Sequence, residues 1–158
     1  MIKMMLKVRR NRFSDIADET RRRLREHVED TGDRVLQRAK DHIENDPKTG
    51  HVYRRETDVS FTTKGGTNVA FTAHKGSTTE HQASAPGEAP ATDMGDLVNE
   101  SKSEMTGPLT NTVTFSSDHA LPLEFGATNM EPRPYLGRSV EEEESSFVAG
   151  ARRIVAGE

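Results

Sequence analysis

The 158-residue sequence has no cysteine and no tryptophan, and only 5% of its residues are aromatic. The absence of cysteine excludes disulfide bonds and thiolate chemistry, and it leaves the redox compartment undetermined. No apolar run approaches the roughly 18 residues that a membrane span needs, and the lysine-interrupted first residues do not resemble a secretory signal. Only 32% of the residues are hydrophobic, so we expect an extended molecule that completes its burial against partner chains and makes no contact with a membrane.

Charge is distributed unevenly along the chain. Residues 1–40 carry 12 Lys and Arg against 7 Asp and Glu, residues 41–79 carry 5 of each, and residues 80–158 carry 5 against 14. A chain with a basic portion and an acidic portion can attract copies of itself or a differently charged neighbour. This distribution does not by itself indicate nucleic-acid binding.

The spacing of apolar residues predicts an α+β fold in a single domain, residues 1–158. Residues 1–46 are predicted to form a short strand at 2–8 and a long amphipathic helix at 12–45, with a bend near Gly32. Residues 47–93 are predicted to form a hairpin and an extended arm. Residues 94–158 are predicted to complete a small, mostly antiparallel sheet, followed by a loop and a C-terminal helix at 137–154.

The middle of the chain carries the strand patterns. Residues 57–63 and 67–73 are predicted to form a hairpin around Gly65 and Gly66, in which Val59 and Phe61 face Val69 and Phe71 across the strands. Residues 74–93 are rich in small residues and proline, so we interpret them as a linker or an arm that becomes ordered on assembly. The alternating, Thr-rich residues 109–115 are predicted to form a strand.

Residues that often carry chemistry are present, but not in catalytic or ligand-binding patterns. His74 and His81 do not match a zinc-ligand spacing, and His27 and His42 lie far apart on the predicted helix. The carboxylate of Glu88 lacks the apolar surroundings that tune an acid–base catalyst. The sequence contains no nucleophile elbow and no phosphate-binding loop. We therefore expect no catalytic residue, no metal and no cofactor, and we predict that the chain is not an enzyme.

Two short motifs in a fixed order resemble those of a known family. The first is SAPGEAPA at residues 84–91, followed by Asp93, Gly95 and Leu97. The second combines EFG at residues 124–126, Met130 and RPYL at residues 133–136. Together they resemble the SAPGEPPA.DTG.L and EFGT…M.PRPFL motifs of the tail-completion, or head–tail joining, proteins of long-tailed bacteriophages. The resemblance covers most of residues 35–145, and relative to that family the hairpin at 57–73 is an insertion.

This resemblance implies a virion structural protein of the phage neck, made in the host cytoplasm and located at the head–tail junction. It implies a self-assembled ring, for which we favour a hexamer because phage tails have sixfold symmetry, with DNA passing through the lumen only as cargo. Its neighbours would be head-completion and tail-terminator or tail-tube proteins. The residues predicted at the subunit interface are Pro86, Gly87, Glu88, Leu123, Glu124, Phe125, Gly126, Arg133, Pro134 and Tyr135.

Two alternatives stay open at this stage. Glu124 and Arg133 either form an ion pair that locks their loop, or Arg133 is held extended by its flanking prolines and contacts a neighbouring subunit. The basic cluster Arg21, Arg22, Arg23 and Arg25 is either a solvated helix face with interleaved acids, which we favour, or a phosphate-binding surface. The second interpretation would make the chain a small nucleic-acid-binding accessory protein.

Overall fold

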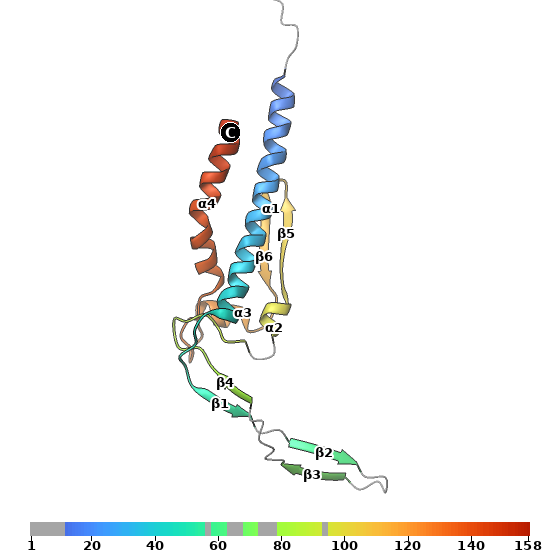
Figure 1. The fold of residues 1–158 in the computed structure, drawn as a ribbon, viewed down its shortest axis with the longest axis vertical. Coiled ribbons are helices and arrows are strands. Elements are labelled where there is room, and N and C mark those ends of the chain that lie inside the picture. Colours follow the sequence, from blue (N-terminus) through green and yellow to red (C-terminus); the bar gives the residue numbers. More distant parts are fainter. Residues whose placement is uncertain (1–11, 56–57, 63–67, 73–78, 93–94) are drawn as a thin grey trace, which may run out of the picture.

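The computed structural model of the protein describes residues 12–55, 58–62, 68–72, 79–92 and 95–158, and the strand predicted at 2–8 lies outside these ranges. At residues 55, 58–62, 68–72 and 79 only the backbone is described. The elements confirm the α+β class (Figure 1). In chain order they are α1 (Phe13–Asn45), β1 (Val52–Arg55), β2 (Asp58–Thr62), β3 (Asn68–Thr72), β4 (Thr79–Gln82), α2 (Asp96–Asn99), β5 (Ser101–Gly107), β6 (Thr110–Phe115), α3 (Ala120–Phe125) and α4 (Leu136–Ala156).

Helix α1 confirms the long helix predicted from the apolar spacing, and it continues without a break past Gly32. It ends where Asp46, which precedes a proline, adopts an extended backbone with ψ near 143°. The Lys48 Nζ donates a hydrogen bond of 2.8 Å to the carbonyl of His42, one of the carbonyls left open at the helix end. Gly32 is buried because the side chain of Asn111 in β6 occupies the space beside it.

Helix α1 is the central element of the body. Helix α4 packs along it, and the antiparallel β5–β6 hairpin packs on another side of α1 (Figure 1). Helix α4 and strand β6 confirm the elements predicted at 137–154 and 109–115. Strand β5 was not predicted, because its sequence SKSEMTG is mostly polar and its burial alternates only between partly buried and exposed residues.

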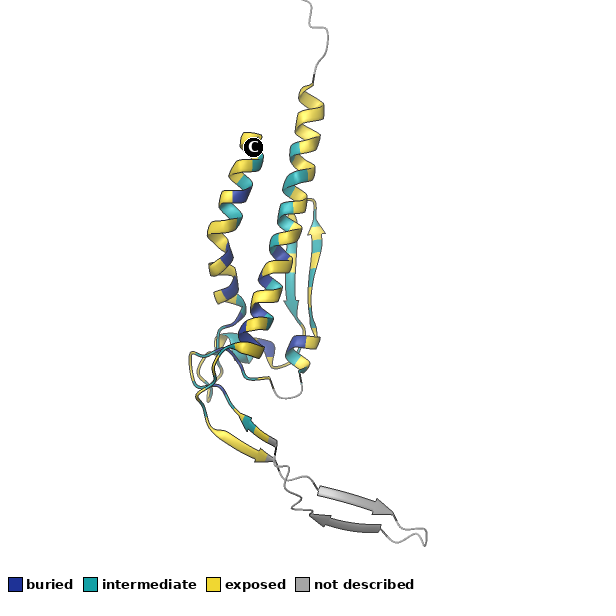
Figure 2. Ribbon diagram, in the orientation of Figure 1, coloured by how far each residue is buried: buried dark blue, intermediate teal, exposed yellow. Residues whose placement is uncertain are grey.

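The hydrophobic core is small and lies at the base of the body, where the end of α1 meets α2, α3 and the start of α4 (Figure 2). It consists of Ala39, Ile43, Ala89, Val98 and Tyr135. The ring of Tyr135 also meets that of Phe115 edge to face, with centroids 5.0 Å apart. Among the described residues, every buried polar side-chain atom has a hydrogen-bond partner.

An arm leaves the base of the body. Its described strands form two antiparallel ladders, β1 with β4 and β2 with β3 (Figure 1). The register of the second ladder pairs Val59 with Phe71 and Phe61 with Val69, which confirms the predicted hairpin pairing.

The interpretation of residues 74–93 as a linker is wrong for the part that the structure describes. Residues 79–82 form β4, and Ser84, Ala89 and Pro90 are buried against the body of the same chain. Two backbone hydrogen bonds fix the entry to this segment, from Gly50 N–H to the Ala83 carbonyl at 3.0 Å and from Ala83 N–H to the His51 carbonyl at 2.9 Å. The small residues and prolines of this described part therefore pack closely against the body.

The Gly32–Asn111 contact predicts an unusual response to a helix-favouring substitution. An alanine Cβ at position 32 would lie 2.3 Å from the Asn111 side chain, whose Oδ1 accepts a hydrogen bond from Ser103. Gly32→Ala should therefore lower the free energy of unfolding by about 1 kcal/mol, although alanine in a helix interior normally adds about that amount. Urea denaturation measures the change. The double variant with Asn111→Ala should recover stability, and a stabilised single variant would contradict the packing.

Candidate assembly surface

The two sequence motifs meet in the structure. The N–H of Gly87 donates a hydrogen bond of 3.0 Å to the carbonyl of Pro132. The guanidinium of Arg133 donates to the carbonyl of Ser84, at 3.2 Å from Nη2 and 3.4 Å from Nε. Residues 84–88 and 132–136, which are separated in sequence by two strands and two helices, therefore form one surface at the base of the body. Helix α3, residues 120–125, is joined to residues 133–136 through the Leu123 carbonyl and the Glu124 carboxylate, and we call the whole surface the motif surface.

Glu88 holds the first motif in place. Its carboxylate accepts hydrogen bonds from Thr49 Oγ1 at 2.5 Å, from Ala85 N–H at 2.8 Å and from Thr49 N–H at 2.9 Å. The Thr49 hydroxyl, followed by these backbone N–H groups, lowers the pKa of Glu88 below its ordinary value. Thr49 was not among the predicted site residues, because its partner is distant in the sequence.

Glu124 caps helix α4. Its carboxylate accepts the backbone N–H groups of Tyr135 at 3.0 Å, Leu136 at 3.0 Å and Gly137 at 2.8 Å. These N–H groups have no partner within the helix, and the negative charge suits the positive end of the helix dipole. A Cβ at Gly137 would lie 2.9 Å from Glu124 Oε1, so glycine permits this approach.

The predicted ion pair between Glu124 and Arg133 is wrong, whereas a contact of Arg133 with a neighbouring subunit stays a prediction. The structure locks the loop locally, but Glu124 binds backbone N–H groups and Arg133 binds the Ser84 carbonyl. The backbone N–H of Arg133 also donates to the Leu123 carbonyl at 2.7 Å. Arg133 is half-buried, and its side chain connects the two motifs within one chain.

The predicted interface residues divide by exposure. Phe125, Pro86 and Gly87 are exposed, and Phe125 retains 74% of its accessible surface. Tyr135 is fully buried in the core, so its side chain is not available on the surface of this chain. The half-buried members are Glu88, Leu123, Glu124, Gly126, Arg133 and Pro134.

One exposed apolar residue of the motif surface was missed. Leu121 is 70% exposed and lies four residues before Phe125 on α3, which places both side chains on the same helix face. Sequence reasoning identified the apolar segment at 120–123 but did not predict this short helix, because Pro122 lies within it. Gly126 ends the helix with φ of 81°, a backbone conformation that favours glycine.

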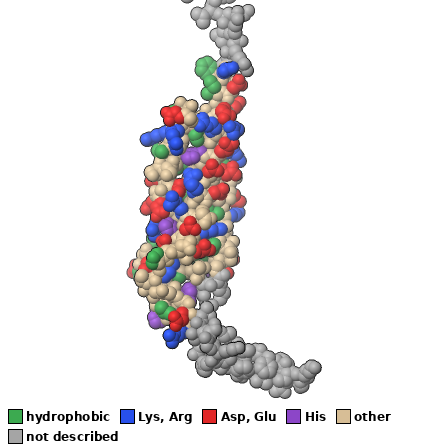
Figure 3. Space-filling model, viewed as in Figure 1, with side chains coloured by type: hydrophobic (Ala, Val, Ile, Leu, Met, Phe, Trp, Pro, Cys, Tyr) green, Lys and Arg blue, Asp and Glu red, His purple; other side chains and the backbone are tan. Residues whose placement is uncertain are grey.

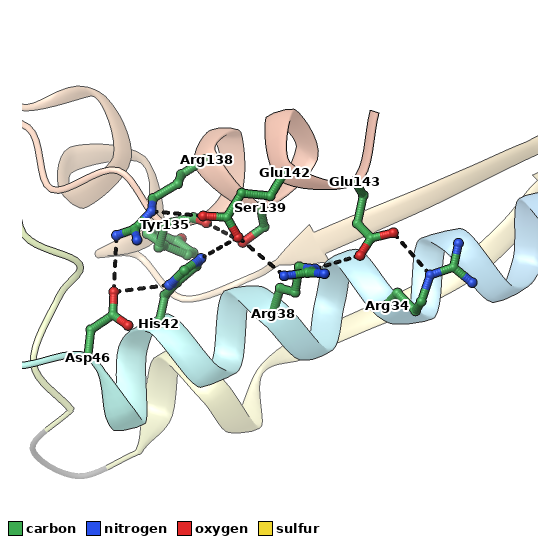
Figure 4. A network of polar contacts seen from close by, with 9 residues as sticks. All are labelled: Arg34, Arg38, His42, Asp46, Tyr135, Arg138, Ser139, Glu142 and Glu143. Carbon is green, nitrogen blue, oxygen red and sulfur yellow. Dashed lines mark hydrogen bonds and ion pairs between the residues drawn. The ribbon is translucent and has the colours of Figure 1, made fainter. Parts of the chain in front are cut away.

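A polar seam joins α1 to α4 (Figure 4). Glu143 of α4 is only 3% exposed and accepts hydrogen bonds from Arg38 Nε at 2.5 Å and Arg34 Nε at 3.0 Å. The bond from Arg38 and that from Arg34 hold the pKa of Glu143 below its ordinary value despite its burial. The contacts of Glu143 with α1 were not predicted from the sequence, because Arg34 and Arg38 are distant from it along the chain.

The seam continues to the end of α1 through His42. This side chain lies 3.0 Å from Asp46 and 3.2 Å from Glu142, and Arg138 lies 3.1 Å from each of these carboxylates. Asp46 is four residues after His42, a helical neighbour that the sequence analysis overlooked. The described residues contain no group of three or more His, Asp or Glu side chains arranged to hold a metal ion.

Two arginines of the basic cluster near the start of α1 are paired within their own helix, and Arg23 donates a hydrogen bond to the backbone carbonyl of Glu158. Arg22 lies 2.7 Å from Glu19 and 2.5 Å from Glu26, and Arg21 lies 3.3 Å from Asp18. Basic and acidic side chains also alternate along both helices on the face shown in Figure 3. These pairings favour a solvated helix face, because a phosphate would have to compete with carboxylates already in contact.

Comparison with protein-family models, with curated proteins and with solved structures returned no match for the chain. No helix within the described ranges combines the length and the apolar character that a membrane crossing requires.

Removal of the Glu124 carboxylate should destabilise the start of α4. Glu124→Ala leaves the three N–H groups of Tyr135, Leu136 and Gly137 without their acceptor. We expect a loss of about 1–2 kcal/mol in the free energy of unfolding, measured by urea denaturation. Glu131→Ala, which removes an exposed carboxylate from the same loop, is the matched control and should cost much less. Equal effects of the two substitutions would contradict the capping role.

The seam predicts a specific sensitivity to acid. The folded-state pKa of Glu143 is below its ordinary value of 4.5. Its stabilisation is therefore fully present above that value and is lost as the pH falls through the lower, folded pKa. Urea denaturation at neutral and acidic pH should show a smaller acid-induced loss for Glu143→Gln than for the wild type. Glu141→Gln, on the exposed part of the same helix, should follow the wild type, and an unchanged profile for Glu143→Gln would contradict the assignment.

Proposed function

We propose that the chain is a non-catalytic virion protein of the phage neck, which forms a ring and joins the tail to the DNA-filled head. The observation that carries this proposal is the meeting of the two motifs. The resemblance rests on two segments that are distant in sequence, and hydrogen bonds from Gly87 and Arg133 join them into one surface. If the likeness of the two segments to the family motifs were a coincidence, there would be no reason to expect the segments to lie in contact.

The distribution of exposed surface also supports a role in assembly. Leu121 and Phe125 project together from the motif surface, and the β1–β4 ladder leaves the body beside it (Figure 1). Exposed aromatic side chains such as Phe125 are enriched at subunit interfaces.

In this proposal the subunits contact one another through the motif surface, most simply as a hexamer. Head-completion proteins would lie on one side of the ring and tail-terminator or tail-tube proteins on the other. DNA would pass through the lumen without base contacts, and carboxylates of the acidic residues 80–158 would discourage its adhesion.

The direct test is electron microscopy of phage particles produced without this protein. We expect DNA-filled heads beside complete, free tails, which join when the purified protein is added. Addition of unrelated purified protein is the control. Normal joined particles in the absence of the protein would overturn the proposal.

A substitution at Phe125 should distinguish an effect on assembly from an effect on folding. Its side chain is 74% exposed in the single chain, so Phe125→Ala should leave the unfolding midpoint nearly unchanged. If Phe125 anchors a subunit contact, its truncation should cost about 2 kcal/mol of association, or about thirtyfold in the amount of protein needed for joining. Val155→Ala, at an exposed apolar residue near the far end of α4, is the matched control. If the Phe125→Ala protein joined heads to tails as well as the wild type does, Phe125 would not be part of the interface.

A further inference from the structure

An apolar groove lies between α4 and β6, with α1 as its floor. Its volume is about 460 Å³. The floor is formed by Val28, Gly32 and Val35, and the walls include Val113 of β6 and Phe147 of α4. The lining surface is mostly apolar, although polar side chains such as Asn111, Glu143 and Glu144 contribute to it, so burial of an apolar side chain in this groove would be favourable.

The rim of the groove exposes further apolar side chains. Leu109 precedes β6 and Val140 lies on α4, and both are exposed members of the lining. Since no β5 residue lines the groove, β6 is the strand of the hairpin that faces α4. Among the described residues β6 pairs only with β5, which leaves its other edge open. An open strand edge beside an apolar groove is suited to the addition of an extended segment.

The chain contains a segment with the matching pattern. Ile2, Met4, Leu6 and Val8 alternate along residues 2–8, the period of a strand with one apolar face. Residues 1–11 carry four Lys and Arg and no acidic residue. They therefore complement the acidic part of the chain, which supplies Glu144 to the groove.

The segment is long enough to reach the groove from its own helix. Residue 12 is about 24 Å from Val28 and about 35 Å from Val35 at 1.5 Å per helical residue. An extended chain that folds back from residue 12 covers about 20 Å at Leu6 and about 33 Å at Ile2, at about 3.3 Å per residue. The apolar positions of the segment thus fall at the level of the groove.

The direction of the chain also fits. Asn111 lies beside Gly32, whereas Phe115 packs on the core that contains Ile43, so β6 runs in the same direction as α1 (Figure 1). A segment that folds back from the start of α1 runs in the opposite direction. It would therefore meet the open edge of β6 as an antiparallel neighbour, the pairing of the other ladders in this chain.

We propose that residues 2–8 of the same chain occupy this groove as a third strand beside β6, with Ile2, Met4 and Leu6 facing α1. The segment would cover the apolar lining and close the sheet edge, and its lysines would lie on the outer face near the carboxylates of α4. A neighbouring copy's segment is the competing occupant, and the experiment distinguishes the two.

The test uses disulfide trapping in the full-length protein, which has no native cysteine to interfere. Met4→Cys is combined with Leu109→Cys or with Val140→Cys at the rim. There are two matched controls. In the first, Met5→Cys, on the opposite face of the predicted strand, replaces Met4→Cys. In the second, Gln37→Cys replaces the rim cysteine, because Gln37 is exposed on α1 and lies outside the groove lining. After mild oxidation, non-reducing gels and mass spectrometry separate disulfides within a chain from those between chains.

We expect a disulfide within one chain for at least one rim pair with Met4→Cys, about tenfold above both controls, because docking raises the local concentration of the thiol. Disulfides only between chains would overturn the proposal in favour of an exchanged segment. Equal disulfide yields for the Met4→Cys pairs, the Met5→Cys control and the Gln37→Cys control would overturn the proposal altogether. Hydrogen exchange provides a second measurement that does not depend on thiol geometry. Leu6→Asp should accelerate exchange of the β6 amides if the segment pairs there, and unchanged exchange would also overturn the proposal.

Discussion

The body of this protein depends on a buried carboxylate held by two arginines. Glu143 has almost no contact with water, and an isolated charge in that position would be very unfavourable. Arg34 and Arg38, one helical turn apart on α1, satisfy both of its oxygens. Because the three side chains must meet in one geometry, they fix the rotation and the axial position of α4 against α1. The chain has few large apolar side chains, and the seam provides the specificity that a larger core would otherwise give.

The same seam explains the uneven charge of the sequence. The basic first part and the acidic last part suggested attraction between copies, but the helices from these parts lie side by side in one chain. Their charges are partly used in the fold through Glu142 and Glu143 of α4. The exposed Arg22 is neutralised within its own helix. The charge distribution therefore indicated an attraction between the basic and the acidic part of the sequence, but not whether the two parts meet within one chain or between chains.

Periodicity predicted the elements that bury one face. The long helix, the C-terminal helix, strand β6 and the pairing of Val59 with Phe71 all follow from spacings of three and four or of two. Strand β5 and helix α3 were missed for opposite reasons. Strand β5 is mostly polar and forms a strand because β6 pairs with it. Helix α3 contains a proline and is too short to show a helical period.

The bonding of the predicted interface residues could not be inferred from the sequence. The motifs identified Glu88, Glu124 and Arg133, yet all three bind backbone groups, and a sequence does not show which backbone N–H or carbonyl will be left open. Tyr135 could not be separated from Phe125 because both are aromatic residues of the same motif. Their burial differs because Tyr135 points into the core from the start of α4, whereas Phe125 lies on the outer face of a short helix.

The different roles of the charged and the apolar residues determine how the motif surface would contact a neighbouring subunit. Its charged residues are occupied in holding loops and the start of α4, so they have little capacity left for a neighbour. What remains available is apolar, chiefly Leu121 and Phe125. Contacts of this kind respond weakly to ionic strength, whereas contacts between exposed charges weaken as salt screens them. Association through the motif surface is therefore expected to persist at salt concentrations that would dissolve an assembly held by the charged helix faces.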